Sequence, residues 1–114
     1  MILVVGGRAS GKRQFVRDRL GYRADQMAPA LLDGCPVVCD LQAMLRTEAE
    51  IEPLLAKLRE KEVVICDEIG CGVVPVDPAE RVWREAVGRL CGRLAAEAEQ
   101  VFRLCCGLAI QLKG

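Results

Sequence analysis

An apolar stretch that runs directly into a glycine-rich loop constrains the fold more than any other feature of this sequence. Residues 1–5 read Met-Ile-Leu-Val-Val, and the loop follows them at once. The spacing of Gly6, Gly11 and Lys12 matches a Walker A phosphate-binding loop through its lysine. The glycines let the backbone turn tightly and direct successive N–H groups toward phosphate oxygens. The sequence therefore predicts a strand, a helix after the loop, and a nucleotide-binding segment made of Gly6, Gly7, Arg8, Ala9, Ser10, Gly11, Lys12 and Arg13.

The residue after the loop lysine departs from the pattern. A Ser or Thr is expected there, because its hydroxyl ligates Mg²⁺, but the chain has Arg13. Two orientations of Arg13 are open: the guanidinium contacts phosphate in place of metal charge, or it turns outward on the first helical turn. The sequence therefore predicts binding of ATP or GTP better than it predicts a magnesium site or efficient catalysis.

Two further apolar segments, residues 36–40 and 62–67, each end in an acid and read as buried strands. Their final residues, Asp40 and Asp67, should face the ligand crevice, because ligands of open α/β sheets bind at the carboxyl ends of the strands. Both are candidate magnesium ligands acting through water. We expect Lys12 to contact the β and γ phosphates, and Asp40 and Glu68 to lie near the metal or the acceptor hydroxyl. The structural alternative is that these acids cap helices or form turns.

The remaining pattern alternates helices and strands. A stripe of Leu and Ile at residues 51–58 predicts a helix that starts near Glu52, and Thr47 with Glu50 has capping-box spacing. A long helix is expected at residues 78–98, and strands at 101–105 and 108–112 should form a hairpin about Gly107. Residues 21–34 read as a connection with at most a short helical turn. We predict one three-layer α/β P-loop domain over residues 1–114, with a mainly parallel sheet of five strands and three helices.

Composition narrows the function classes. Apolar residues make up 52% of the chain and aromatic residues 4%, so Leu, Val, Ala and Ile build the core. The net charge of zero gives no general reason to expect nucleic acid or an anionic membrane as partner. Residues 1–23 nevertheless hold six basic residues and one acid, which suits a polyanionic ligand. The alternative for Arg17, Arg19 and Arg23 is a solvated basic helix face.

The chain has seven cysteines and no histidine. The absence of a secretory pattern and of a long apolar run leads us to expect a cytoplasmic protein with reduced thiols and no membrane span. Pairs such as Cys35 and Cys39, or Cys66 and Cys71, lack the CxxC spacing that zinc sites prefer. We therefore expect buried apolar cysteines rather than a metal site.

The run at residues 67–75, Asp-Glu-Ile-Gly-Cys-Gly-Val-Val-Pro, resembles the bifunctional adenosylcobinamide kinase/adenosylcobinamide-phosphate guanylyltransferase family. Trp83-Arg84, Gly88-Arg89 and the loop at residues 6–12 are similar to the same family. The resemblance implies a RecA-like nucleotide-binding fold, a trimeric assembly and a role in cobalamin biosynthesis. It also implies one site that phosphorylates the aminopropanol hydroxyl of cobinamide and then transfers GMP through a guanylylated histidine.

Several positions depart from that family. Arg13 replaces its Ser, Asp67 its Asn, Cys91-Gly92 its Asn-Gln pair and Ala109 its late proline. The segment that carries the family's histidine shrinks here to residues 21–35 and contains none. We therefore expect a kinase-like protein that acts on a corrinoid without guanylyl transfer. The alternatives are a catalytically degenerate nucleotide-binding or scaffold protein of the same fold, and a small kinase for another alcohol.

Overall fold

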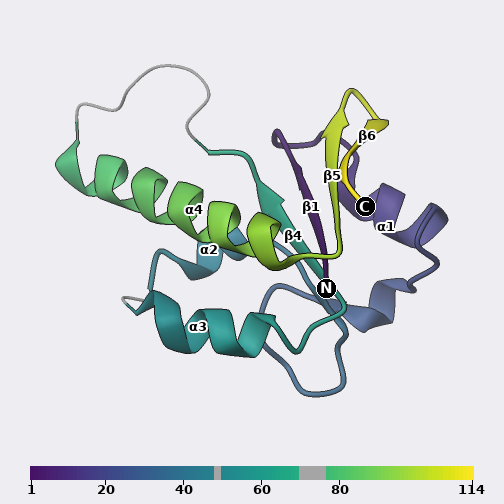
Figure 1. Ribbon diagram of the computed structural model, residues 1–114, viewed down its shortest axis with the longest axis horizontal. Helices are drawn as coiled ribbons and strands as arrows, with labels where there is room; N and C mark the ends of the chain where they lie inside the picture. Colours follow the sequence, from purple (N-terminus) through teal and green to yellow (C-terminus); the bar gives the residue numbers. More distant parts are fainter. Residues whose placement is uncertain (48–49, 70–76) are drawn as a thin grey trace.

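The computed structural model describes residues 1–47, 50–69 and 77–114 (Figure 1). Its centre is a six-stranded sheet in the order β2-β3-β4-β1-β5-β6, in which the pairs from β2 to β5 are parallel and β6 is antiparallel to β5. The strands are β1 (Ile2–Gly6), β2 (Met27–Ala28), β3 (Val37–Val38), β4 (Val63–Asp67), β5 (Gln100–Cys105) and β6 (Leu108–Lys113). The helices are α1 (Lys12–Asp18), α2 (Leu41–Met44), α3 (Ile51–Leu58) and α4 (Pro78–Glu97), with a 3₁₀ turn at Ala24–Gln26.

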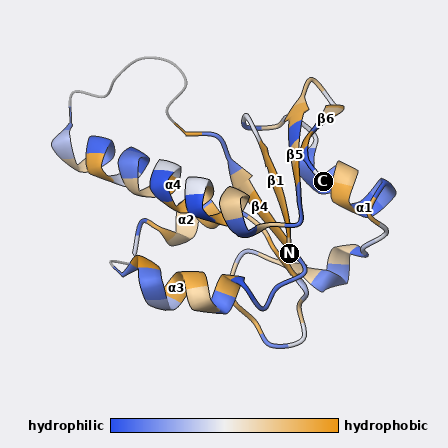
Figure 2. Cartoon of the chain, viewed as in Figure 1, coloured by the Kyte–Doolittle hydropathy of each residue, from blue (hydrophilic) through white to orange (hydrophobic). Residues whose placement is uncertain are grey.

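The sheet is covered on both faces, which confirms the predicted α/β architecture. Successive residues of a strand point to opposite faces, and β1 divides its side chains in this way. Leu3 and Val5 belong to one buried cluster with residues of α2, α3 and α4, whereas Val4 packs with Phe15 and Val16 of α1. Figure 2 shows the hydrophobic colour concentrated on the central strands. A strand buried on both faces reads as a continuous apolar run, as the sequence around β1 and β4 does.

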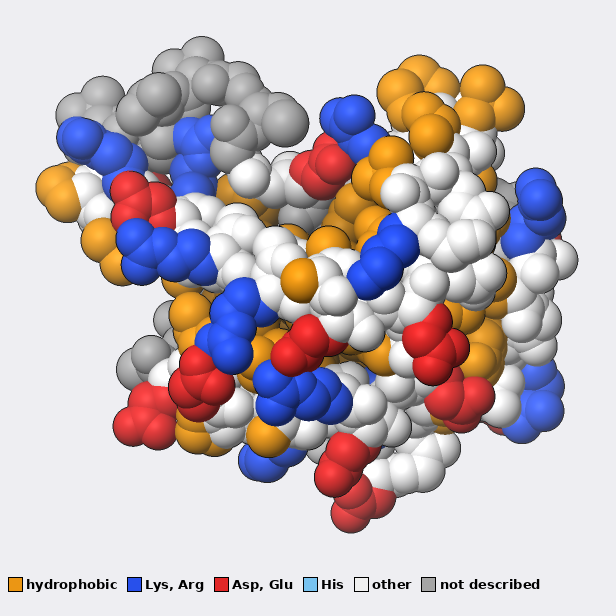
Figure 3. Space-filling model, in the orientation of Figure 1, with side chains coloured by type: hydrophobic (Ala, Val, Ile, Leu, Met, Phe, Trp, Pro, Cys, Tyr) orange, Lys and Arg blue, Asp and Glu red, His pale blue; other side chains and the backbone are white. Residues whose placement is uncertain are grey.

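Ion pairs join α3 and α4 along their solvent side. Arg59 bonds Glu97 at 2.6 Å, and Arg93 pairs with Glu52. In Figure 3 the acidic and basic side chains alternate over this part of the surface. The pairs are exposed, so they add little free energy of folding, and the buried leucines of both helices supply most of their attachment.

Three local features differ from the expectations. Met27–Ala28 forms β2 and Leu41–Met44 forms α2, although neither element was predicted; both are too short to show a periodic pattern. The sheet in the described part therefore has six strands rather than five. The prediction of a capping box formed by Thr47 and Glu50 is wrong. Glu50 is itself the N-cap of α3, and the Thr47 hydroxyl donates to the Met44 carbonyl at 3.3 Å. A hydroxyl at a helix end can bond a nearby carbonyl instead of capping the next helix.

The hairpin about Gly107 is confirmed. Cys106 and Gly107 link β5 to β6 and both have positive φ, at 52° and 77°, as a two-residue primed turn requires.

No helix in the described ranges is long and apolar enough to cross a membrane.

Candidate functional site

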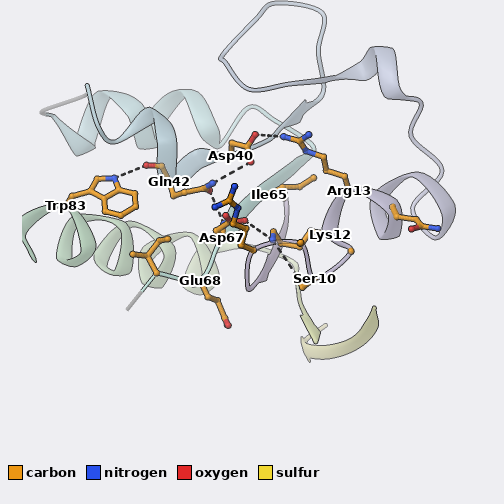
Figure 4. Close-up of a pocket in the computed structure, with 14 residues that line it drawn as sticks. Ser10, Lys12, Arg13, Asp40, Gln42, Ile65, Asp67, Glu68 and Trp83 are labelled. Atoms are coloured by element: carbon orange, nitrogen blue, oxygen red, sulfur yellow. Dashed lines mark hydrogen bonds and ion pairs between the residues drawn. The ribbon is translucent and has the colours of Figure 1, made fainter. Parts of the chain in front are cut away.

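A cleft opens at the carboxyl edge of the parallel sheet, where β1 and β4 end side by side (Figure 4). Gly6 lies opposite Asp67 in the sheet register, and the Glu68 N–H donates to the Gly6 carbonyl at 2.7 Å. The cleft has a volume of about 870 Å³. Its lining includes Arg8 to Gln14 of the loop and first helical turn, together with Asp40, Gln42, Ile65, Asp67, Glu68, Ile69 and Trp83. Residues from four separate segments of the chain therefore meet in one cavity.

Contacts with the strands and the hairpin fix the conformation of the loop. Gly11 has a φ of 94° and precedes α1, a conformation that glycine adopts without a steric penalty. The Gly107 N–H donates to the Ser10 carbonyl at 3.0 Å, so the β5–β6 hairpin braces the loop from outside. A Cβ on Gly6 would lie 2.6 Å from the Ser10 Oγ and 2.7 Å from the Leu104 carbonyl oxygen. The first glycine is therefore required by packing against both the loop and β5.

Lys12 lies in the floor of the cleft. Its side chain is 7% exposed, and it is the only buried charged residue in the part of the chain described by the structure. The ammonium donates to the Gly7 carbonyl at 2.7 Å and lies 2.7 Å from the Asp67 carboxylate. Burying a charge is costly unless it is paired and hydrogen-bonded. The fold meets this requirement by placing the end of β4 beside the loop.

Arg13 lines the cleft, and its guanidinium has a carboxylate partner that the sequence did not indicate. Its guanidinium pairs with the carboxylate of Asp40 (Figure 4). The expected strand at residues 36–40 is limited to β3, Val37–Val38, so Asp40 lies between that strand and α2. The Arg13 side chain is 58% exposed and that of Asp40 33% exposed, so the pair lies at the rim of the cleft. Asp40 occupies the N-cap position of α2 with a φ of 54°. Its carboxylate is engaged by Arg13, and at 3.5 Å by the Gln42 amide, rather than by the end of the helix.

Gln42 was not identified from the sequence, yet its contacts connect the two strand-end acids. Its Nε2 donates to Asp40 at 3.5 Å, and its Oε1 accepts the Asp67 N–H at 2.9 Å. Its backbone carbonyl accepts the Trp83 indole N–H at 2.8 Å, and Arg46 lies over the Trp83 ring, 3.5 Å from its centroid. A single glutamine in an apolar stretch gives no signal of this kind, because α2 itself was not predicted.

Glu68 lines the cleft but is not gathered with Lys12. Its carboxylate pairs with Arg103 of β5 at 2.9 Å, and in Figure 4 it points to the side opposite Asp40. The candidate residues therefore form separate ion pairs: Lys12 with Asp67, Arg13 with Asp40, and Glu68 with Arg103. The rest of the family-like motif, residues 70–75, lies outside the described residues.

The cysteines only partly follow the expectation of burial. Cys39 and Cys66 are buried, as expected. Cys105 and Cys106 are exposed at the hairpin, so the expectation of burial is wrong for these two residues. Cys71 lies outside the described residues. Burial raises the pKa of the Cys39 thiol, with nearby Arg13 opposing the shift. The hydrogen bond with Cys91 and then burial raise the pKa of Cys66. No cluster of three metal-binding side chains occurs among the described residues.

Replacing Gln42 with Ala is expected to destabilise the fold by about 1–3 kcal/mol, because the Asp67 N–H loses its acceptor beside the buried Lys12. Urea unfolding measures the change. Gln14→Ala is the matched control, since Gln14 lines the cleft from an exposed position on α1 and should change stability by less than about 0.5 kcal/mol. Equal stability of the two variants would show that Gln42 does not hold the strand end.

Comparison with known proteins identifies the family. Residues 25–112 match the family model described as cobinamide kinase / cobinamide phosphate guanyltransferase, a range that includes Asp40, Asp67 and Glu68. The bifunctional adenosylcobalamin biosynthesis protein CobU of Escherichia coli is 34% identical over an alignment of 85 residues that covers 71% of this chain and 47% of that protein. CobU of Salmonella typhimurium is 34% identical over an alignment of 82 residues that covers 68% of this chain and 45% of that protein.

The chain thus spans about half the length of the curated relatives that it matches. The family match covers most of its residues, including Asp40 and Asp67, whereas β1, the glycine-rich loop and α1 precede the matched range. The chain therefore belongs to the cobinamide kinase / cobinamide phosphate guanyltransferase family.

Proposed function

We propose that this chain is a cobinamide kinase-like protein of cobalamin biosynthesis that binds ATP or GTP in the cleft and phosphorylates an alcohol, the aminopropanol hydroxyl of cobinamide. The observation that carries the proposal is the position of Lys12, a buried ammonium in the floor of a cleft that a glycine-rich loop surrounds. A buried lysine beside such a loop supplies positive charge where phosphate oxygens would approach.

In this proposal the residues of the cleft have separate roles in binding the phosphates and in accepting a proton. The loop N–H groups and Lys12 hold the phosphates, and Asp67 keeps the ammonium of Lys12 in place. Asp40 and Glu68 both line the cleft, and in this proposal one of the two carboxylates accepts the hydroxyl proton of the acceptor. Phosphoryl transfer depends mostly on positioning and charge neutralisation, and these are the roles that the residues of the cleft would have.

Guanylyl transfer through histidine is left out of the proposal. The 114 residues contain no histidine, and only residues 19–36 connect α1 to β3 through the 3₁₀ turn and β2. A phosphoramidate intermediate on an imidazole has no acceptor among these residues. We also propose the trimer that the family resemblance implies, and the cytoplasmic location expected from the absence of a secretory pattern; sedimentation of the purified chain tests the first.

A second candidate is a nucleotide-binding protein of the same fold without catalysis. The observation that favours it is that both carboxylates proposed to accept the hydroxyl proton form ion pairs, Asp40 with Arg13 and Glu68 with Arg103. A carboxylate whose oxygens already bond a guanidinium is less free to contact the hydroxyl of an acceptor.

The kinase proposal predicts formation of ADP or GDP that depends on cobinamide. Nucleotide diphosphate released by the purified chain, with and without cobinamide, measures this, and mass spectrometry of the corrinoid detects the added phosphate. Turnover that needs cobinamide supports the kinase. Nucleotide binding without turnover supports the second candidate, and turnover with simple amino alcohols alone would indicate a kinase for another acceptor.

A further inference from the structure

The residues of the cleft do not fit the magnesium ion that a phosphate-binding loop normally holds. Mg²⁺ requires hard oxygen ligands in near-octahedral geometry, usually carboxylates with waters and substrate phosphates. Position 13 offers a guanidinium instead of a hydroxyl. The two strand-end carboxylates are already paired with cations, Asp40 with Arg13 and Asp67 with Lys12 at 2.7 Å. A divalent ion would have to displace a cation of the loop from either acid.

The Arg13 guanidinium contacts one of the two carboxylates on which such an ion would depend. It comes from the residue directly after the loop lysine and reaches the carboxylate of Asp40, which lies two residues beyond β3. Gln42 contacts the same carboxylate, so Asp40 is held on both sides. More than half of the Arg13 side chain is exposed, and it lines the cleft.

We propose that the cleft binds the polyphosphate of a nucleotide without a divalent cation, with Arg13 as a fixed positive group between Asp40 and the phosphates. The inference rests on the proposed nucleotide binding. A guanidinium has five N–H donors in a rigid fork, so one edge bonds a carboxylate while another edge bonds phosphate oxygens. The guanidinium would then stand between a carboxylate and phosphate groups, as a bound metal ion would. Lys12 adds a second positive charge deeper in the cleft.

Binding of ATP and GTP to the whole chain, measured by calorimetry in EDTA and in excess Mg²⁺, tests the inference. For the unmodified chain we expect the two dissociation constants to agree within about threefold, because no protein ligand of the metal is gained. For Arg13→Ser we expect the affinity in EDTA to fall at least about tenfold, since a charge-assisted contact is lost, and Mg²⁺ to restore part of it. Arg17→Ser removes the same charge from an exposed position of α1 that does not line the cleft, and should leave both constants unchanged.

Asp40→Asn separates the two roles of that carboxylate. In the proposed arrangement Asp40 contacts Arg13 and no metal, so the variant should change the affinity by the same factor in EDTA and in Mg²⁺. If Asp40 holds magnesium, the variant should lose affinity in Mg²⁺ but not in EDTA. That loss, or a more than tenfold weaker affinity of the unmodified chain in EDTA, would overturn the inference and leave nucleotide binding intact. Absence of binding in both conditions would overturn the proposed function as well.

Discussion

Lys12→Met is expected to lower the affinity for ATP and GTP by at least about a hundredfold, the largest functional effect of any single change in the cleft. Methionine keeps most of the apolar stem and removes the ammonium. That ammonium lies in the floor of the cleft, 2.7 Å from both the Gly7 carbonyl and the Asp67 carboxylate. Charge-assisted contacts to phosphate contribute about 1.5–3 kcal/mol each, so the loss of several contacts accounts for the effect. Calorimetric titration under the conditions that support binding by the unmodified chain measures it.

Loss of folding must be separated from loss of binding, because the variant leaves Asp67 without its cation. The double variant Lys12→Met/Asp67→Asn removes both charges and should regain stability without regaining affinity, since an unpaired buried charge is costly. Lys57→Met, on the exposed side of α3, is the control for removal of a lysine elsewhere. Unchanged affinity of a folded Lys12→Met chain would refute the phosphate-binding loop itself.

Gly6→Ala is expected to have the largest structural effect within the loop and to destabilise the chain by about 1–3 kcal/mol. Its Cβ would lie 2.7 Å from the Leu104 carbonyl of β5, and backbone in the middle of a sheet cannot move away cheaply. The Ser10 hydroxyl, 2.6 Å from the same Cβ, would also have to move, which displaces the loop beside Lys12. Urea denaturation measures the stability, and we expect the nucleotide affinity to fall with it.

Gly7→Ala is the matched control for this prediction. No atom lies within 4 Å of a Cβ built on Gly7, and its φ is not positive. The stability should therefore change by less than about 0.5 kcal/mol. Similar unfolding midpoints for the two alanine variants would mean that the close approach of Leu104 does not constrain the loop.

The main elements of the fold could be predicted from the sequence because their patterns are long and regular. The apolar runs of β1 and β4, the periodic face of α4 and the turn at Gly107 each identified an element with nearly correct ends. The elements that were missed, β2 and α2, contain two and four residues, so neither shows a period. Their existence depends on the sheet: Met27 and Ala28 pair with Val37 and Val38, whose strand is fixed by β4.

The candidate site, like the fold, could be predicted only in part. Local spacing identified the loop and the acids at the ends of two strands, because parallel strands must present their carboxyl ends at one edge. Local spacing gave no information about which cation pairs with which acid, since Arg13 and Asp40 are 27 residues apart and Arg103 and Glu68 are 35 apart. Nothing in the local pattern of residues indicated that Gln42 contacts both Asp40 and Asp67.

The sequence by itself determined that this chain builds an α/β domain with a glycine-rich loop, a lysine and two strand-end acids at one edge, because each of these follows from short-range periodicity and spacing. Only the tertiary structure decided that Lys12 is buried against Asp67 and that Arg13 reaches across to Asp40. The physical reason is that a charge placed in or beside a core must find a partner, and the strand order β3-β4-β1 decides which carboxylates are near enough to provide it.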